Sequence, residues 1–569
     1  MFFVGAENKD ILHPDGFEVS KRDLLLSSLT INILSLAMPT MTLQIYDRIL
    51  PNPGSGTLPV LITGVCIAVI LETVMRLSRS YCMGWAGAAY EHRLSCQAIN
   101  HILRSDLGAP VSYGIGEHMN RLAAIGRLRD FYNGYSTITI FELLFVPLFI
   151  MLIIYISGPL AIVPAAVLML FTAISYFQGR TLRNALQERD EIDDARYNFL
   201  IESLEGIHSL KSFGLENIFS RRYEALEEES TIANYRVTED SARAFDTASV
   251  FSHLMVAGII GAGAVLVLQG TISTGALIAT ILLSGRIMQP VQRALGLWAK
   301  YQDYTISRQK VESIFEIPLH PSAPDEGASP EREGTLSLDN VSFRRSDSSP
   351  LLLQNISLDL PKGACISISS DNASSLDALL DIIAGLYAPT MGIVTVDGQN
   401  ILRYAAKDLI NHVGYIQSEG VIFRGTIRDN LTCFGQISDD KVQEMSALFQ
   451  IDKDIASLPS GFDTFLSGSA TDTIPPGLKQ RIAMVRVLAP KPRLIIFDNA
   501  DRALDRDGYN LVHNLLARLM GKATIIISSD DQNLTSQASQ FFVLEKTRLR
   551  EIPRNIDTRK NVVYTELSR

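Results

Sequence analysis

The stretch CISISSDNASSLDALLDIIAGL (residues 365–386) is the starting point for interpreting the C-terminal half of the chain. A short apolar run leads into a loop of small residues, and a segment with helical apolar periodicity follows. A strand, a tight loop and a helix N-terminus in this order form a phosphate cradle, because the backbone amides face the anion. The pattern required is G-x-x-x-x-G-K-[ST], and this stretch contains no lysine.

Composition divides the chain into a membrane half and a soluble half. Hydrophobic residues make up 47% of the 569 residues, and they concentrate before about residue 290. The net charge of −10 gives no basic footprint for a nucleic-acid partner. The five cysteines are scattered without metal-ligand spacing and are interpreted as reduced packing residues.

The first half predicts a short cytosolic lead (1–20) and a transmembrane domain (21–310). Six apolar spans form three hairpins with short external loops, and both long polar helical stretches between them lie on one side. The predicted spans are Leu24–Ile49, Leu58–Met75, Ile138–Ile156, Pro159–Phe177, Val250–Leu268 and Thr274–Met288. Glu72 and Glu142 lie at membrane depth; pairing near a membrane boundary is favoured, and exposure to a translocation path is the alternative.

A linker rich in Pro, Gly and Ser (311–333) leads to the soluble domain, residues 334–569. This domain alternates short β-rich runs with helical ones, which predicts an α/β fold with parallel core strands. The expected strands are TLSLDNVSF, CISIS, GIVTVDG, HVGYIQ, RLIIFD, TIIISS and FFVLE.

Six membrane helices followed by such a domain resemble an ABC exporter half-transporter: an all-α six-helix membrane domain followed by an α/β cassette of the P-loop type. Three runs resemble the type I secretion subfamily: LAMPTMTLQIYDRILPNPGSGTL (36–58), LEGIHSLKSFGLE (204–216) and LLSGRIMQPVQRALGLWAKYQ (282–302). The resemblance implies a multi-pass inner-membrane protein with a cytoplasmic cassette. It also implies a protein or peptide cargo, a periplasmic adaptor and an outer-membrane channel.

The resemblance also sets the register of the phosphate loop. The run AGLYAPTMGIVTVDG (384–398) is similar to the family's segment downstream of that loop. Ser370 and Ser375 then occupy the two glycine positions, Leu376 replaces the phosphate-binding lysine, and Asp377 replaces the magnesium-binding Ser or Thr. The nucleotide-facing loop is therefore Ser370, Asp371, Asn372, Ala373, Ser374, Ser375, Leu376, Asp377 and Ala378.

Most of the family's other site positions also depart from its pattern. Arg345 stands where an aromatic residue stacks on adenine, Asn499 where the catalytic glutamate is expected, and Ser529 where the switch histidine is expected. Gln417 is retained, and Asp498 is retained as the remaining magnesium candidate. The signature that faces a partner's nucleotide becomes Ile474, Pro475, Pro476, Gly477 and Leu478, of which only Gly477 is kept.

These substitutions predict a degenerate cassette without catalytic residues, because an amide cannot act as a general base and prolines remove backbone donors. We expect ATP and magnesium to bind weakly or not at all at this chain's own loop. The favoured hypothesis is a pseudo-ATPase subunit paired with a second, active half-transporter. Two alternatives remain open: a structural or regulatory membrane scaffold with a dead cassette, and a homodimeric exporter driven by ATP through unconventional chemistry.

Overall fold

The computed structural model describes residues 21–51, 56–133, 135–321, 331–346, 349–468 and 474–553. The predicted lead 1–20, residues 322–330 of the predicted linker and residues 554–569 lie outside the described part of the chain. Contacts divide the chain into two compact units: Met1–Leu103 with Tyr113–Ile317, and Arg104–Ser112 with Pro318–Arg569. Each unit is described by itself.

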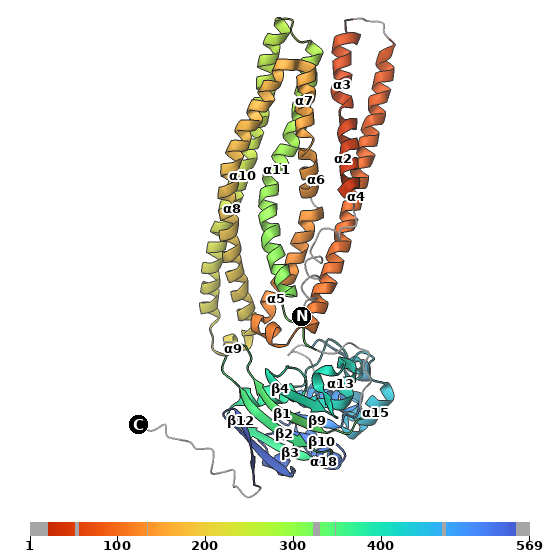
Figure 1. Ribbon diagram of the computed structural model, residues 1–569, viewed down its shortest axis with the longest axis vertical. Coiled ribbons are helices and arrows are strands. Elements are labelled where there is room, and N and C mark those ends of the chain that lie inside the picture. The colour runs from red at the N-terminus through yellow and green to blue at the C-terminus, as the bar shows by residue number, and fades with distance from the viewer. Residues whose placement is uncertain are drawn as a thin grey trace, which may run out of the picture. The chain divides into compact units, whose positions relative to one another are not determined.

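The first unit consists of long helices (Figure 1). They are α2 (Lys21–Ser35), α3 (Ala37–Gln44), the π-helix η2 (Ile45–Ile49), α4 (Thr57–Arg104), α5 (Gly108–Asn133), α6 (Tyr135–Leu143), α7 (Val146–Ser157), η3 (Gly158–Ala161), α8 (Ile162–Glu205), α9 (Ile207–Ser212), α10 (Glu216–Leu268) and α11 (Thr274–Phe315). Several of these helices continue far beyond their apolar spans into polar sequence, as the long polar stretches predicted.

Five helical segments are long and apolar enough to cross a membrane: Arg22–Ile49, Thr57–Arg104, Ile138–Glu205, Glu216–Leu268 and Thr274–Ala294. The third segment holds two of the six predicted spans, since the chain reverses direction at Gly158, where φ is 52° (Figure 1). A positive φ costs glycine little, and Pro159 then starts the short turn η3. The six-helix membrane domain is therefore consistent with the structure.

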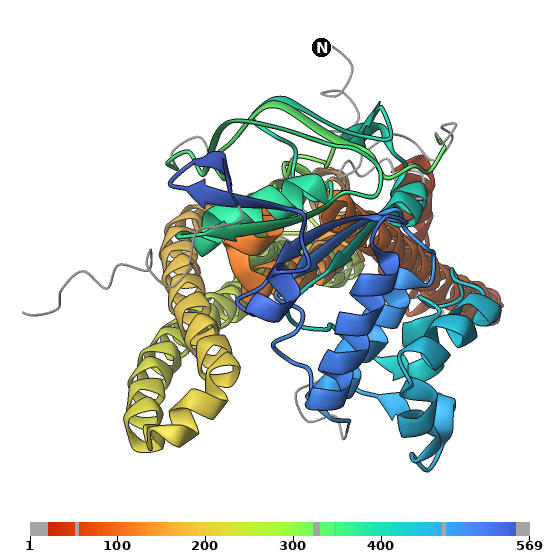
Figure 2. The ribbon, with the colours of Figure 1, turned by 90° about the horizontal axis from the view of Figure 1, so that it is seen from below.

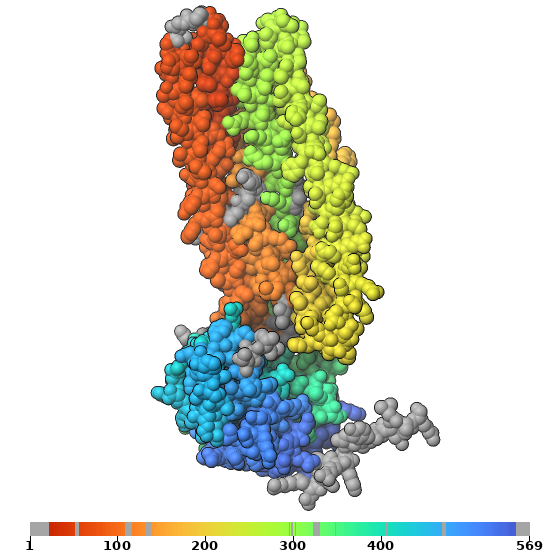
Figure 3. Space-filling model, turned by 180° about the vertical axis from the view of Figure 1, so that it is seen from behind, coloured from red at the N-terminus to blue at the C-terminus, as the bar shows by residue number. Residues whose placement is uncertain are grey.

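Helix α11 is the central helix of this unit. It packs against α3, α6, α7, α8 and α10, and half of its most apolar window is buried, compared with 11% for α4. Seen from behind, the yellow and green helices α10 and α11 stand beside the red and orange N-terminal helices (Figure 3). The exposed apolar side chains of α4, such as Val60 and Ile70, form a surface suited to lipid.

The second unit is an α/β cassette with three sheets. Its elements are β1 (Leu336–Phe343), β2 (Leu353–Leu360), β3 (Cys365–Ser370), α12 (Ala373–Ile383), β4 (Met391–Val396), β5 (Gln399–Asn400), η4 (Ile401–Arg403), α13 (Ala406–His412), β6 (Val413–Ile416), β7 (Gly425–Thr426), α14 (Ile427–Leu431), α15 (Asp439–Leu448), α16 (Ile451–Ala456), η5 (Gly461–Asp463), β8 (Phe465–Leu466), α17 (Pro476–Leu488), β9 (Leu494–Asp498), α18 (Arg506–Leu519), β10 (Thr524–Ser528), α19 (Gln532–Thr535), β11 (Gln540–Glu545) and β12 (Arg548–Ile552).

The central sheet has the order β12-β11-β3-β10-β9-β6. Its strands from β11 to β6 are parallel, and β12 is antiparallel to β11. The second sheet, β2-β1-β4-β5, is antiparallel, and β7 pairs with β8. All seven predicted strands are present, whereas β2, β12 and the two-residue strands β5, β7 and β8 were missed.

The central sheet separates two apolar cores. Alternate residues of β10 point to opposite faces, so Ile525 and Ile527 join one core and Ile526 joins the other. The core with Ile526 includes α12 and the antiparallel sheet, and the opposite core includes α17 and α18. In Figure 2 the green strands and helix lie on one side of the central sheet and the blue helices on the other.

The segment between α4 and α5 belongs to the cassette unit. The backbone amide of Asp106 donates to the carbonyl of Pro318 at 2.9 Å, and the amide of His320 donates to the carbonyl of Arg104 at 2.9 Å. Ser105 and Leu319 form an isolated antiparallel bridge. The chain that enters the cassette is therefore held to the α4–α5 turn by backbone hydrogen bonds.

Candidate nucleotide-facing site of the cassette

The predicted nucleotide-facing residues gather where the parallel strands end. The loop at 370–378 follows β3, Gln417 follows β6, Asp498 and Asn499 end β9, and Ser529 follows β10. The carboxyl ends of parallel strands meet at one edge of a sheet, and this edge is where ligands of open α/β sheets bind. The structure therefore brings together the positions that the sequence assigned to the chain's own nucleotide.

The phosphate loop is closed by its own hydrogen bonds. Only two residues, Asp371 and Asn372, separate β3 from α12. The hydroxyl of Ser370 accepts the amide of Asn372 at 3.1 Å. Asn372 caps α12: its side chain accepts the amide of Ser374 at 3.1 Å, and its carbonyl accepts the amides of the next two residues, 375 and 376. Four amides of the would-be cradle are thus engaged within the loop.

Side chains of this loop point into the core. Ser375 is fully buried, and its hydroxyl donates to the carbonyl of Lys546 at 3.4 Å. Leu376, at the lysine position, is 8% exposed and belongs to the core beneath α12 together with Ala378. A leucine here contributes apolar burial in place of the cation that a triphosphate requires.

Three carboxyl groups and one phenol meet beside the loop. The hydroxyl of Tyr415 donates to Oδ2 of Asp498 at 3.2 Å, and it also hydrogen-bonds Asp381. Burial is the main cause that raises the pKa of Asp377, of Asp381 (to about 6) and of Asp498. The charges on Asp377 and Asp498 raise the pKa of Asp381 further. Among the described residues, no group of three His, Cys, Asp or Glu is arranged to hold a metal ion.

Sequence reasoning missed Asp381 and Tyr415. The signal was available, because Asp381 follows Asp377 by four residues on a helix and therefore shares its face. Tyr415 stands two residues before Gln417 in the strand VGYI, so it points to the same side as Gln417. Arg345 lies exposed after β1, close enough for its charge to lower the pKa of both Asp377 and Asp381.

The positions of the general base and the switch are held by protein partners. The amide nitrogen Nδ2 of Asn499 donates to Asp498 Oδ1 at 3.2 Å, and its backbone amide donates to the carbonyl of Ser528 at 2.7 Å. The hydroxyl of Ser529 donates to Asp501 Oδ1 at 2.9 Å and accepts the amide of Asp531 at 3.0 Å. These contacts tie the ends of β9 and β10 together.

The signature positions form the start of α17. Ile474, Gly477 and Leu478 are buried, and Pro475 and Pro476 are exposed. Pro475 caps the helix and Pro476 is its first residue, so two backbone positions at this N-terminus lack an N–H. Ile474 and Leu478 belong to the core opposite to that of Leu376. The sheet therefore separates the signature from the chain's own phosphate loop.

Gln417 connects the site to α17. Its backbone carbonyl accepts a hydrogen bond from Nε2 of Gln480 at 2.8 Å, and the same nitrogen donates to the carbonyl of Ala500 at 3.2 Å. Gln480 is 1% exposed. The buried amide thus fixes the ends of β6 and β9 relative to α17.

Comparisons with known proteins agree with this architecture. The family described as ABC transporter transmembrane region matches residues 24–291, and the family described as ABC transporter matches residues 353–502. A leukotoxin export ATP-binding protein from Aggregatibacter actinomycetemcomitans is 25% identical over 93% of this chain and 75% of its own length. A cyclolysin secretion/processing ATP-binding protein from Bordetella pertussis is 26% identical over 92% of this chain and 73% of its own length.

An alpha-hemolysin translocation ATP-binding protein from Escherichia coli is 25% identical over 93% of this chain and 75% of its own length. The solved structure of a bacterial Atm1-family ABC exporter with ATP bound superposes with a TM-score of 0.79. It covers 93% of this chain and 94% of its own, at 18% identity, so it supports the fold.

This chain belongs to the ABC transporters and has the architecture of an exporter half-transporter, with an ABC membrane region followed by an ABC cassette. The three relatives above are named for the export, secretion or translocation of toxins. It is a multi-pass protein of the inner membrane, and its cassette is cytoplasmic.

Proposed function

We propose that this chain is a non-hydrolysing subunit of a type I polypeptide exporter and works beside a second half-transporter that hydrolyses ATP. The observation that carries this proposal is the closed loop at 370–378. A phosphate cradle needs amides that are free to face the anion, and here the amides of 372, 374, 375 and 376 already have partners within the loop.

The residues present do not fit a magnesium–triphosphate group. The lysine that they lack supplies a charge-assisted contact worth about 1.5–3 kcal/mol. In its place stands buried Leu376, followed by Asp377, whose charge repels phosphate. Asp377 and Asp381 add negative charge beside Asp498, where a triphosphate's own charge would have to lie. We therefore propose weak or absent binding of nucleotide at this loop.

We also assign the hydrolysis of ATP to the partner subunit. Asn499 cannot take a proton from water, and the hydroxyl of Ser529 is engaged with Asp501. In this family a nucleotide lies between two cassettes, so a partner's phosphate loop would face Ile474–Leu478 of this chain. Each of the two nucleotide sites between the cassettes then contains residues that depart from the family's pattern. The partner therefore needs its own intact phosphate loop and its own general base. An assembly in which active dimers stand beside this chain is compatible with the same chemistry.

The remaining partners follow from the relatives. The matched proteins carry names of toxin export and secretion, and we propose a protein or peptide cargo for this chain. A periplasmic adaptor and an outer-membrane channel complete the proposed route.

Calorimetry with magnesium–ATP tests this proposal. The full chain is titrated alone in detergent, and a hydrolysing relative serves as the positive control. We expect no heat of binding from this chain. Binding as tight as that of the control would show that the loop opens to admit phosphate, and the chain would then be a nucleotide-binding subunit.

An ATPase assay on variants of each subunit shows which subunit hydrolyses ATP. When this chain is purified with its partner, replacing the partner's catalytic glutamate by glutamine should abolish phosphate release. Asp498→Ala in this chain should leave the rate within about twofold, since Asp498 holds no nucleotide under the proposal. Phosphate release that instead depends on Asp498 would assign chemistry to this chain.

A further inference from the structure

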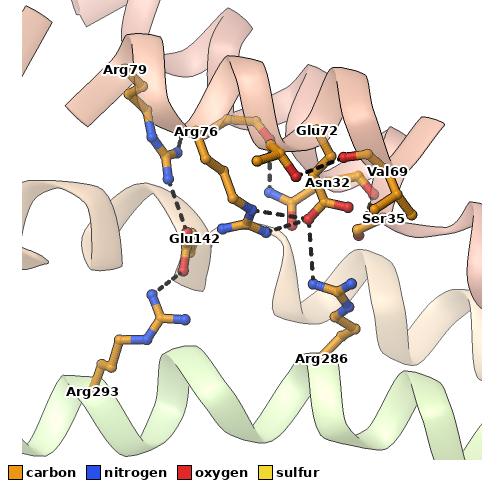
Figure 4. Close-up of polar contacts among 11 residues, drawn as sticks. Asn32, Ser35, Val69, Glu72, Arg76, Arg79, Glu142, Arg286 and Arg293 are labelled. Atoms are coloured by element: carbon orange, nitrogen blue, oxygen red, sulfur yellow. Dashed lines mark hydrogen bonds and ion pairs between the residues drawn. The ribbon is translucent and has the colours of Figure 1, made fainter. Parts of the chain in front are cut away.

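The first unit, which contains the membrane-spanning helices, holds a cluster of four arginines and two glutamates that we name the arginine layer. Its members are Glu72, Arg76 and Arg79 of α4, Glu142 of α6, and Arg286 and Arg293 of α11. Among the described residues it combines four arginines with two glutamates, although the whole chain carries a net charge of −10. Figure 4 shows the side chains of the three helices converging. Placing ionisable side chains within membrane-spanning segments costs free energy, and such residues usually serve a function.

Each glutamate is shared by two arginines. Arg293 donates to Glu142 at 2.8 Å, and Arg79 lies 3.4 Å from the other oxygen of Glu142. Glu72 accepts from Arg76 at 2.7 Å, and Arg286 lies 3.7 Å away. Both carboxylates are nearly buried, with 10–12% of their side-chain area exposed. The layer therefore keeps a surplus of positive charge.

Not every hydrogen-bond donor of the arginine layer is used. The side chain of Arg79 is 6% exposed, and its Nε atom is buried without a hydrogen-bond partner among the described residues. Its Nη1 donates to the hydroxyl of Ser28 at 3.0 Å. A guanidinium offers five N–H donors in a planar fork that matches a carboxylate. A further carboxylate can reach this fork at the two partly exposed arginines of the layer, Arg286 and Arg293.

A pocket lined by both polar and apolar side chains adjoins the layer at Arg293. Its volume is about 360 Å³, and it is lined by Phe245, Ala248, Ser249, Gln289, Gln292 and Arg293. Arg286, Gln289 and Arg293 are spaced by three and four residues, so they follow one face of α11. The rise from Arg286 to Arg293 is about 10 Å, which an extended peptide covers in about three residues.

We propose that the arginine layer and this pocket bind acidic side chains of the polypeptide cargo, so that Arg286 and Arg293 select aspartate- and glutamate-rich segments. This inference rests on the proposed export of a polypeptide and specifies its substrate class. Arginines that are 32–33% exposed, on the most central helix, can meet a chain that enters the unit. Their position between helices favours a peptide over a lipid headgroup.

Fluorescence anisotropy with a labelled oligo-glutamate peptide tests the proposal. The full chain is placed in nanodiscs of neutral phosphatidylcholine, without nucleotide. We expect binding of oligo-glutamate, and no binding of an oligo-lysine peptide of equal length. The double variant Arg286→Gln/Arg293→Gln should weaken binding about 10- to 100-fold, the loss expected for charge-assisted contacts.

Two further double variants separate charge from folding. Arg286→Lys/Arg293→Lys keeps both charges and should retain most of the binding. Arg236→Gln/Arg243→Gln removes two exposed arginines of α10, which pair with Glu188 and Glu239, and should leave binding unchanged. Equal loss in this control would reduce the effect to net charge and overturn the assignment.

Other results would also overturn the proposal: an affinity unchanged by the glutamine variant, or no binding by the parent chain. If nanodiscs with anionic phosphatidylglycerol abolish peptide binding and this lipid crosslinks to position 286, the layer holds headgroups instead. Because the assay contains neither ATP nor a partner, its failure leaves the proposed loss of ATP hydrolysis untouched. Conversely, ATP binding by the chain would leave this result standing.

Discussion

The side-chain oxygen of Asn372 accepts the backbone amide of Ser374 at 3.1 Å, at the point where a phosphate-binding loop would hold its anion. The same residue caps α12, and its carbonyl accepts two further amides. An N-cap of this kind stabilises a helix start by about 1 kcal/mol. The loop thus satisfies the helix N-terminus with protein groups, where a nucleotide cassette relies on its ligand.

Rebuilding the loop should create nucleotide binding. The quadruple variant Ser370→Gly/Ser375→Gly/Leu376→Lys/Asp377→Ser restores the pattern G-x-x-x-x-G-K-S. We expect it to bind magnesium–ATP at least about 100-fold more tightly than the parent, because one cation is added and one anion removed. Calorimetry measures the change. Asn372→Gly alone releases one amide but keeps Leu376 and Asp377, and it should gain little. Equal affinity of parent and quadruple variant would contradict our account of the loop.

Restoring the catalytic positions alone should not restore hydrolysis. Asn499→Glu/Ser529→His supplies a base and a switch while the closed loop remains. The new glutamate also adds negative charge beside Asp498, which already stands near Asp377 and Asp381. We expect no phosphate release above the level of the parent chain in a coupled assay. Turnover by this double variant would mean that the native loop does admit ATP.

The sequence predicted the architecture well because hydrophobic pattern determines it. The six apolar spans and the seven predicted strands follow from runs and periods that packing requires. Strand β2 was missed although its ISLDL run alternates apolar and polar residues as a half-buried strand does, and it pairs antiparallel with β1. Alignment of the downstream run 384–398 with the family's segment was enough to place Leu376 at the lysine position. The closure of the loop could not be predicted, since it depends on which backbone amides Asn372 reaches.

The arginine layer was only half visible in the sequence. Glu72 and Glu142 stood out as charges at membrane depth, and the favoured interpretation was pairing near a boundary. The structure pairs both of them. Their partners Arg286 and Arg293 lie more than 140 residues away from these glutamates in the chain, so only the packing of α11 against the other helices brings them together.

Asp381 should make the cassette less stable as pH rises. Burial, with the charges of Asp377 and Asp498, raises its pKa to about 6 from the ordinary 3.8. The folded state then binds the proton more tightly than the unfolded state, so stability is highest below about pH 4 and is lost as pH rises through 6. Asp381→Asn should remove this loss, so that the variant gains stability over the parent above pH 6 but not near pH 4.

Thermal unfolding of the full chain between pH 4 and 8 measures this difference. Asp429 provides a control of opposite sign, because hydrogen bonds from the backbone and side chain of Thr426 lower its pKa. Asp429→Asn should therefore lose stability above the ordinary pKa of an aspartate and change little below it. A pH profile of Asp381→Asn parallel to that of the parent would show that Asp381 titrates normally.

The buried contact between Asp397 and His412 should be costly to break. Oδ2 of Asp397 lies 2.7 Å from Nδ1 of His412, and both side chains are at most 1% exposed. Oδ1 accepts the amides of Gly334 at 2.6 Å and Thr335 at 2.9 Å. Asp397→Ala would remove the shared acceptor of these two amides and the buried carboxylate partner of His412, and we expect a loss of about 3–5 kcal/mol in the free energy of unfolding.

The thiol of Cys365 reports this loss. Burial raises its pKa to about 11, so it should react only when the cassette unfolds. In a chain whose other four cysteines are replaced by serine, urea should expose Cys365 at a clearly lower concentration in Asp397→Ala than in the parent. Asp339→Ala, at an exposed position of β1, should shift the midpoint by about 0.5 kcal/mol or less. Equal shifts in the two variants would mean that the buried contact stabilises the cassette no more than a surface residue does.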